Sequence, residues 1–234
     1  MARQFVNLLN LSILYGQVQL LVHKGMDVNA TNNEGHSPLH LAVILGKIAM
    51  TKLLIESGAD VNANVGCGVI NPEHQNNTPL HFAAIKGKTP MTQLLIESGA
   101  AVDQNNRREE TPLHLASQNG NIEVFHVLIK RGADLNSKDN YGNTLLHKAV
   151  SKCQMNMVHV LMAYNMDVNV KNFYGDTAVQ FASMNGNLDM VRTLVNDYNA
   201  NVKSTNNYHD TALSSARLSD NQKMVDLLTS YEAT

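Results

Sequence analysis

A six-residue phrase recurs along this chain at a nearly constant interval. It reads S-P-L-H-L-A from Ser37 and returns with small changes, beginning at Thr78, Thr111, Thr144, Thr177 and Thr211. Successive copies start 41, 33, 33, 33 and 34 residues apart, so the period is 33 residues with one insertion. A fixed period of this length predicts a stacked array in which each unit packs only on its neighbours.

A second phrase keeps the same period. It reads G-M-D-V-N from Gly25 and G-A-D-V-N from Gly58, and related copies begin at Gly99, Gly132 and Asn165. Glycine commonly ends a helix, because it adopts the left-handed conformation at little cost. The second phrase therefore predicts the end of one helix in every unit.

The unit from 106 to 138 shows the local structure that the two phrases predict. Thr111 is a natural N-cap, and Pro112 suits the first position of a helix, where its missing N–H is not needed. Gly120 ends this short helix, and an apolar stripe at helical spacing predicts a second one after it. Residues 133–142 are then predicted to form an extended, turn-rich finger.

A 33-residue unit that carries T-P-L-H resembles the repeat of the ankyrin-repeat family, over essentially the whole chain. The resemblance implies an all-α solenoid of about seven helix-turn-helix-finger repeats that form a single domain, 1–234. The first and last repeats are degenerate, which is typical of caps and indicates a complete array. We place an inserted loop at 64–77 and the repeats at about 1–31, 32–63, 64–105, 106–138, 139–171, 172–205 and 206–234.

Composition limits the classes of partner and compartment. The formal net charge is −2 and the pI about 6.5, which does not favour nucleic acid or a membrane surface as a partner. Cys67 and Cys153 provide no disulfide framework, so a reducing compartment is expected. No apolar stretch is long enough to span a bilayer, and the N-terminus lacks a signal-peptide pattern. We expect a cytoplasmic monomer, with the nucleus, or the host cytoplasm for a secreted effector, as alternatives.

The histidines of the recurrent phrase are the first candidates for metal ligands. His40, His81, His114 and His147 each occupy its fourth place, one repeat apart, which is too far to share one ion. The resemblance implies instead that each imidazole hydrogen-bonds near the Thr or Ser that heads its own repeat and to the neighbouring finger. The sequence also lacks the phosphate-binding, hydrolase and zinc-protease motifs. We therefore predict no metal, no cofactor and no catalytic residues.

The surface positions that vary between repeats are the candidate partner contacts. In the ankyrin family, partners touch the fingers and the first helices. Aromatic residues stand three residues before the Thr of the last three fingers, and at the same place in an earlier finger basic residues stand instead. These finger candidates are Tyr141, Phe173, Tyr174, Tyr208, Arg107 and Arg108. Two interpretations remain open: the rings contact a partner, or they only pack along neighbouring fingers.

The turn between the two helices of a repeat supplies a second set of candidates. Its members are Ile44, Leu45, Ile85, Lys86, Lys152 and Met184. The apolar members in the first half of the chain, Ile44, Leu45 and Ile85, are unexpected on a solvated surface and suggest an apolar groove. Val69 and Ile70 of the inserted loop either bind a ligand with that groove or pack over it.

Four asparagines are candidates for modification. Asn29, Asn62, Asn136 and Asn169 each end the sequence L-x5-D-[VL]-N, which is similar to sites that an asparaginyl hydroxylase uses on ankyrin repeats. Hydrogen bonding within the finger turns is the favoured alternative.

The sequence thus predicts a non-enzymatic protein–protein interaction module: an adaptor, scaffold or inhibitor whose partner is another, unidentified protein. The alternatives are a host-directed effector of an intracellular microbe, suggested by frequent Asn, and a recruiting subunit of an enzymatic assembly such as a ubiquitin ligase.

Overall fold

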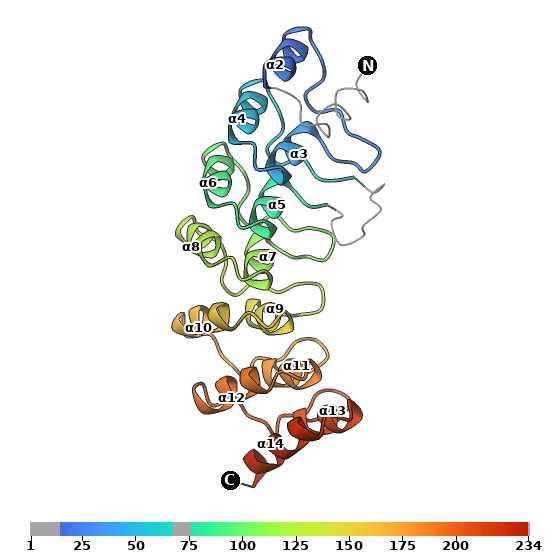
Figure 1. Cartoon of the computed structure of the whole chain (residues 1–234), viewed down its shortest axis with the longest axis vertical. Coiled ribbons are helices and arrows are strands. Elements are labelled where there is room, and N and C mark those ends of the chain that lie inside the picture. Colours follow the sequence, from blue (N-terminus) through green and yellow to red (C-terminus); the bar gives the residue numbers. More distant parts are fainter. Residues whose placement is uncertain (1–14, 67–75, 234) are drawn as a thin grey trace. The chain divides into compact units, whose positions relative to one another are not determined.

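A computed structural model describes residues 15–66 and 76–233 (Figure 1). Within these residues the chain forms 13 α-helices and no strand, which confirms the predicted all-α class. The described helices are α2 (Tyr15–His23), α3 (Pro38–Ile44), α4 (Ile48–Glu56), α5 (Pro79–Ile85), α6 (Thr89–Glu97), α7 (Pro112–Gln118), α8 (Ile122–Lys130), α9 (Leu145–Ser151), α10 (Met155–Ala163), α11 (Ala178–Met184), α12 (Leu188–Asn196), α13 (Ala212–Leu218) and α14 (Gln222–Glu232). The predicted atypical start of the first repeat, up to Leu14, lies outside the described residues.

Six pairs of helices follow α2, each with a short first helix and a longer second one. Every first helix has seven residues, and the second helices have nine or, in α14, eleven. Each pair is joined by a tight turn and followed by an extended segment, which we call a finger. This order is the helix-turn-helix-finger unit that the 33-residue period predicts.

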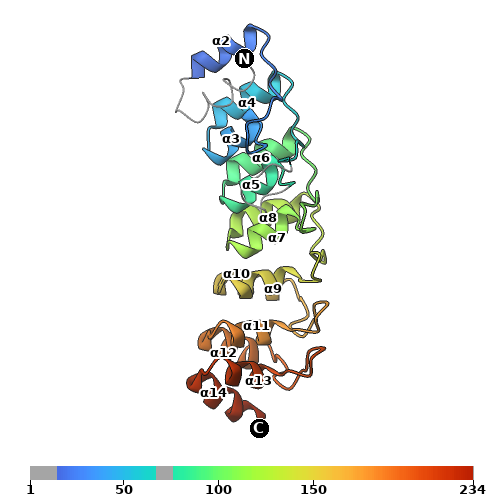
Figure 2. The same cartoon turned by 90° about the vertical axis from the view of Figure 1, so that its right-hand side faces the viewer.

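Contacts between the described residues group into two compact units. The N-terminal unit contains the described residues up to 116 together with 123–134, and the C-terminal unit contains 117–122 and 135–233. In the N-terminal unit α3 packs on α4 and α5, and α5 on α6; in the C-terminal unit α11 packs on α9, α12 and α13. Within each unit, first helices follow one another in one column and second helices in another, with the fingers along the other edge (Figures 1 and 2).

The first helices begin as their sequences predict. Ser37 caps α3, and its side chain accepts a hydrogen bond from the His40 backbone N–H, while the His40 side chain bonds back to the Ser37 N–H. This reciprocal arrangement is a capping box, with His in the place where Glu or Gln is usual. The same box is present at Thr78, Thr144 and Thr177. The T-P-L-H phrase therefore marks the start of a helix, and its histidine completes the capping box.

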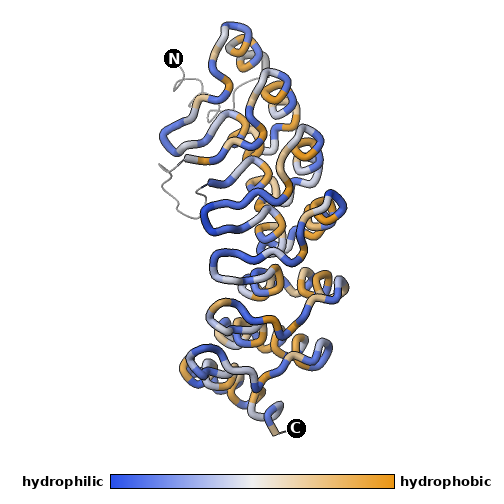
Figure 3. Tube along the Cα trace, turned by 180° about the vertical axis from the view of Figure 1, so that it is seen from behind, coloured by the Kyte–Doolittle hydropathy of each residue, from blue (hydrophilic) through white to orange (hydrophobic). Residues whose placement is uncertain are grey.

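The core of each unit lies between the helix layers. Leu39, Leu80, Leu113 and Leu145 hold the third place of the recurrent phrase or the one beside it and are fully buried. Ala83 is buried as well, so that neighbouring first helices can approach closely. Figure 3 shows the helices carrying most of the apolar residues, whereas the fingers are largely hydrophilic. Stacking thus uses the recurrent apolar residues and leaves the fingers and turns at the surface.

Several of the glycine places are filled by other residues, of which Cys153 and Asn165 are two examples. Cys153 has φ +56° at the turn where Gly46, Gly87 and Gly186 stand in other repeats, and Asn165 has φ +58° at the end of a second helix. The array keeps the same backbone at these places despite the cost of a β-carbon. Within the described residues no helix has the length and apolar character needed to cross a bilayer.

Candidate protein-binding surface

The four histidines of the recurrent phrase serve the fold. His40 Nδ1 accepts a hydrogen bond from the Ser37 backbone N–H (3.1 Å), and Nε2 lies 3.1 Å from the Asn77 carbonyl oxygen in the next finger. His81 makes the same pair of bonds, with Thr78 N–H and with the Glu110 carbonyl oxygen. His147 makes them with Thr144 N–H and with the Asp176 carbonyl oxygen. His114 accepts from Thr111 N–H (3.2 Å). These contacts confirm the predicted structural role.

The geometry fixes the protonation state of these imidazoles. Nδ1 must be the acceptor, because it faces a backbone N–H. The ring proton is therefore on Nε2, which donates a hydrogen bond to the carbonyl oxygen. Burial lowers the pKa of His40 and of His81 from 6.5 to about 4, against the opposing effect of the carbonyl bond. Burial also lowers the pKa of His147. The folded array holds neutral imidazoles at neutral pH.

A polar ladder ties the bases of adjacent fingers together. Five residues before the Thr of a repeat stands an Asn or Asp whose side-chain oxygen accepts hydrogen bonds from two backbone N–H groups of its own finger. Asn172, for example, accepts from Tyr174 N–H and Asp176 N–H. The amide of Asn172 also donates to Asn143 Oδ1 (2.9 Å), and that of Asn206 donates to Asp176 Oδ1 (2.8 Å). Each finger is thereby held in a fixed position relative to its neighbour.

The predicted finger aromatics lie together on the C-terminal unit. We call Tyr141, Phe173, Tyr174 and Tyr208 the aromatic row. Their exposed fractions are 44%, 63%, 43% and 69%. The rings of Tyr141 and Tyr174 stack with centroids 6.3 Å apart, and Phe173 N–H donates to Tyr141 O (3.0 Å). Asn207 extends the contact by donating to Tyr174 O (2.9 Å). The row therefore combines packing between fingers with a large exposed area.

Other sequence candidates fall in separate places. Arg107 is exposed and Arg108 half-buried on a finger that lies in the N-terminal unit. In that unit Leu45 and Lys86 are exposed at the helix turns, and Ile44 and Ile85 are half-buried. Lys152 and Met184 are exposed at turns of the C-terminal unit. Val69 and Ile70 lie outside the described residues, so the two interpretations of the inserted loop remain as the sequence left them.

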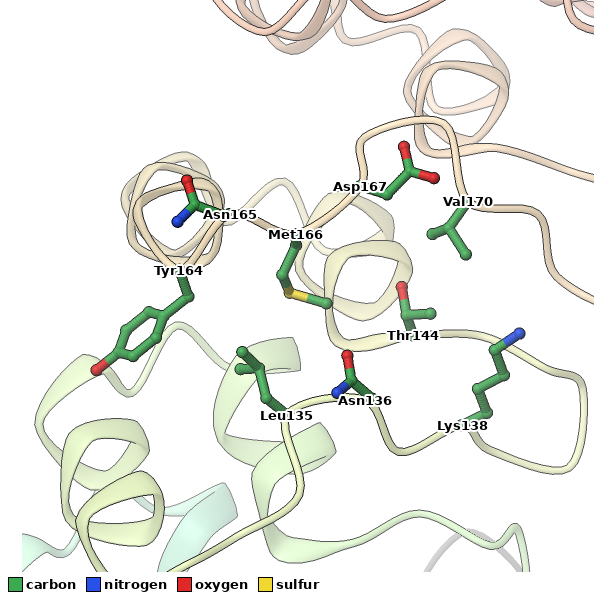
Figure 4. A pocket seen from close by; sticks show the side chains of 9 residues that line it. All are labelled: Leu135, Asn136, Lys138, Thr144, Tyr164, Asn165, Met166, Asp167 and Val170. Carbon is green, nitrogen blue, oxygen red and sulfur yellow. The ribbon is translucent and has the colours of Figure 1, made fainter.

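A cavity of about 350 Å³ in the C-terminal unit was missed by sequence reasoning (Figure 4). It lies between the roots of two successive fingers, with Leu135 on one side and Met166 and Val170 on the other. Tyr164 and Lys138 stand at its two ends in this view. The available signal was Met166, which occupies a place where most other repeats have Ala.

The asparagines considered for modification bridge successive repeats. Asn29 Nδ2 donates to Gly58 O (3.2 Å), and its Oδ1 accepts from Asp60 N–H (2.8 Å). Asn62 makes the same two bonds, to Gly99 O (3.1 Å) and from Ala101 N–H (2.8 Å). Asn169 accepts from Asn201 N–H (2.8 Å), and Asn136 lines the cavity. The bonds agree with the favoured structural alternative; hydroxylation stays a prediction.

Asp103 stands where Asn62 stands in the preceding repeat, and this departure allows a test. Both Asp103 oxygens accept from Asp134 N–H (3.2 Å), but a carboxylate cannot donate to a carbonyl as Asn62 does. Burial, opposed by the Asp134 N–H bond and aided by the Asp134 charge, raises the pKa of Asp103. We expect Asp103→Asn to stabilise the protein at pH 7 by about 1 kcal/mol, measured by urea unfolding.

The expected pH dependence of this gain follows from the sign of the shift. Because the pKa of Asp103 is raised on folding, the folded protein binds this proton more tightly than the unfolded chain does. The stability of the wild type therefore falls as pH rises from the unfolded-state pKa to the folded-state pKa. The advantage of Asp103→Asn should therefore shrink towards pH 4. Asn62→Asp is the matched control and should lose about 1 kcal/mol at pH 7. Equal stability of all three proteins would contradict the bridging role.

Comparison with known proteins identifies the repeat. The chain matches the family model described as ankyrin repeats over residues 6–65, 63–139, 102–172 and 146–234. It is similar, at 44% identity over 54 residues, to a fowlpox virus protein named as an ankyrin repeat protein, in a match that covers 21% of this chain and 12% of that protein.

Two further relatives carry other functions in their names. One is the palmitoyltransferase akr1 of Emericella nidulans, 48% identical over 48 residues, 20% of this chain and 6% of that protein. The other is the potassium channel AKT1 of Oryza sativa subsp. indica, 42% identical over 48 residues, 20% of this chain and 5% of the channel. The chain thus spans a small part of the length of each relative. Because the family model matches nearly the whole sequence, this chain belongs to the ankyrin-repeat family.

Proposed function

We propose that this chain is a non-catalytic protein-interaction module and that it binds a partner protein through the aromatic row of the C-terminal unit. Membership of the ankyrin-repeat family supports the general role in protein interaction. The exposure of four aromatic side chains on hydrogen-bonded fingers supports this particular surface. Large, rigid and partly polar rings are frequent at the centres of interfaces.

The rigidity of the fingers gives this surface its advantage. A loop that is ordered only on binding loses conformational entropy, which weakens the complex. Here the Asn172–Asn143 and Asn206–Asp176 bonds hold the fingers before any partner arrives, and the stacked pair Tyr141–Tyr174 is already formed. We place the module in the cytoplasm, where the exposed thiol of Cys153 would stay reduced.

The test replaces the tyrosines of the row and keeps the fold. In Tyr141→Ala/Tyr174→Ala/Tyr208→Ala, we expect the recovery of proteins captured from a lysate to fall by roughly tenfold or more, because hot-spot aromatics contribute 1 kcal/mol or more each. Quantitative mass spectrometry of the captured proteins is the measurement, and circular dichroism checks the fold.

The matched control is Leu218→Ala. It removes an apolar side chain of the same unit that is more exposed than any ring of the aromatic row and lies at a turn and not on a finger. Capture should be unchanged in this control. If the triple variant captures the same proteins at the same level as the wild type, the aromatic row is not the binding surface.

A further inference from the structure

The turns of the N-terminal unit form a surface that the aromatic row does not involve. Helix α3 begins next to its finger at Ser37 and ends at the turn after Ile44, and α5 runs in the same way from Thr78 to Ile85. The turns therefore lie at the opposite end of the first helices from the fingers. We call Ile44, Leu45, Lys47, Ile48, Lys86 and Lys88 the turn patch.

The charge of this region has one sign. Segments 37–55 and 78–96 contain Lys47, Lys52, Lys86 and Lys88 and no Asp or Glu. All four lysines are exposed. Within the part of the chain that the structure describes, none of them forms an ion pair. The region thus presents positive charge that no carboxylate among the described residues pairs with.

Apolar side chains lie among these charges. Leu45 is 50% exposed and Ile48 is 40% exposed, on the two sides of Lys47. A β-carbon on Gly46 would be 3.6 Å from Lys88 Cε and 3.7 Å from its Nζ, so the Lys88 side chain lies over the turn of the preceding repeat. The two turns consequently form one continuous surface, apolar and basic.

The fold does not explain two of these lysines. Lys47 and Lys88 are the N-cap residues of α4 and α6, and neither makes a side-chain capping bond. At α12 and α14, by contrast, the N-caps Asn187 and Asn221 accept bonds from Met190 N–H (3.0 Å) and Met224 N–H (3.2 Å), whereas Gln154 of α10 makes no such bond. A cation at a helix N-terminus also opposes the helix dipole. Local rules broken without a structural gain are typical of functional positions.

We infer that the turn patch docks an acidic amphipathic segment of a partner protein. Its carboxylates pair with Lys47, Lys86 and Lys88, and its aliphatic side chains cover Leu45 and Ile48. Charge complementarity selects the sign of the partner, and the exposed aliphatic carbons select a segment that also carries apolar side chains. This surface lies in a different unit from the aromatic row and does not depend on it.

The test uses Lys47→Asn/Lys88→Asn, which separates binding from folding. Restoring the caps should raise the unfolding temperature by a few degrees, because a good N-cap stabilises a helix. Random peptides of about 16 residues are selected on phage against the wild type, with the variant used for counter-selection. We expect the recovered peptides to be rich in Asp, Glu and aliphatic residues and to bind the variant roughly tenfold more weakly by fluorescence anisotropy.

Two controls give the alternatives clear outcomes. Lys24→Asn/Lys130→Asn removes two exposed lysines elsewhere in the same unit and should bind these peptides normally, as should Tyr141→Ala/Tyr174→Ala/Tyr208→Ala. Recovery of no variant-sensitive peptide, or of peptides without net negative charge, overturns the inference. Variant-sensitive binding to vesicles containing phosphatidylserine, without such peptides, would overturn it too and assign the patch to a membrane surface.

Discussion

Between pH 7.5 and pH 4.5 the protein is expected to lose about 5 kcal/mol of its free energy of unfolding, through His40 and His81 alone. Burial holds the pKa of both imidazoles at about 4 in the folded chain, against 6.5 for an exposed histidine. Protonation would place a hydrogen on Nδ1, which faces the backbone N–H of Ser37 or Thr78. The charged imidazole is therefore much less favourable in this fold than in the unfolded chain.

The direction of the effect follows from proton linkage. Because the folded-state pKa is depressed, the unfolded chain binds more protons at every pH between about 4 and 6.5, so stability rises with pH across this window and levels off above it. Domains are stable by only about 5–15 kcal/mol, so the expected loss is large enough to bring the protein close to unfolding. Urea unfolding followed by circular dichroism at pH 7.5, 5.5 and 4.5 measures it.

A matched variant is provided by the chain itself. Gln180 holds the place of the histidine in the fifth helix pair, where its Oε1 accepts from Thr177 N–H (2.8 Å) and its Nε2 donates to Asp210 O (2.7 Å). Glutamine makes both bonds without a titrating group. His40→Gln/His81→Gln should therefore fold at pH 7.5 and lose far less stability at pH 4.5 than the wild type. Parallel pH profiles for the two proteins would contradict the burial of neutral imidazoles.

The features that repeat could be predicted from the sequence. Thr111 and Pro112 predict the start of a helix, and Gly120 predicts its end. Six in-phase copies of the recurrent phrase predict a stacked array and no other fold. The role of the histidines followed as well, because a family resemblance extends to residues that serve the stack. The offset of Tyr141 and Tyr174 predicted that they would lie on adjacent fingers, which the stacked rings confirm.

The features that depart from the repeat could not be predicted in the same way, because each depends on contacts across the fold. The exposure of Leu45 was expected from its place in the turn, but the approach of Lys88 to that turn was not. The cavity beside Met166 depends on side-chain volumes on two fingers. A residue that breaks the pattern can be compensated by a second departure, which the structure shows.

Lys148 and Asp139 form such a pair of compensating departures. Lys148 occupies the place of Leu41, Leu115 and Phe181 in other repeats, on α9. Asp139 takes the place of the Asn that begins the finger turn elsewhere. Lys148 Nζ lies 2.7 Å from Asp139 Oδ2, with 11% of the lysine side chain and none of the aspartate side chain exposed. Burial raises the pKa of Asp139, but Lys148 and Asn143 lower it more, so the carboxylate is charged at neutral pH.

Removing one member of this pair should be costly. In Lys148→Leu the buried carboxylate keeps its bond from Asn143 Nδ2 (3.1 Å) and loses its counter-charge. We expect a loss of about 3–5 kcal/mol, the usual consequence of an unpaired buried charge. The free energy of urea unfolding at pH 7.5 measures it. A loss below about 1 kcal/mol would mean that water reaches the pair and that it contributes as little as a surface ion pair.

Removing both members should restore most of the stability. In Asp139→Asn/Lys148→Leu, the new residues reproduce the combination of Asn106 with Leu115 in the N-terminal unit, where Asn106 Oδ1 accepts from Arg108 N–H (2.8 Å) and Glu110 N–H (3.0 Å). The amide would keep the turn bonds that Asp139 now makes to Tyr141 and Asn143 N–H, and leucine would fill the place of the lysine stem. We expect the double variant to be as stable as the wild type, or more stable by about 1–4 kcal/mol. The double-mutant cycle also includes the single variant Asp139→Asn. A loss in the double variant equal to the sum of the losses in Lys148→Leu and Asp139→Asn would show that the two residues do not interact.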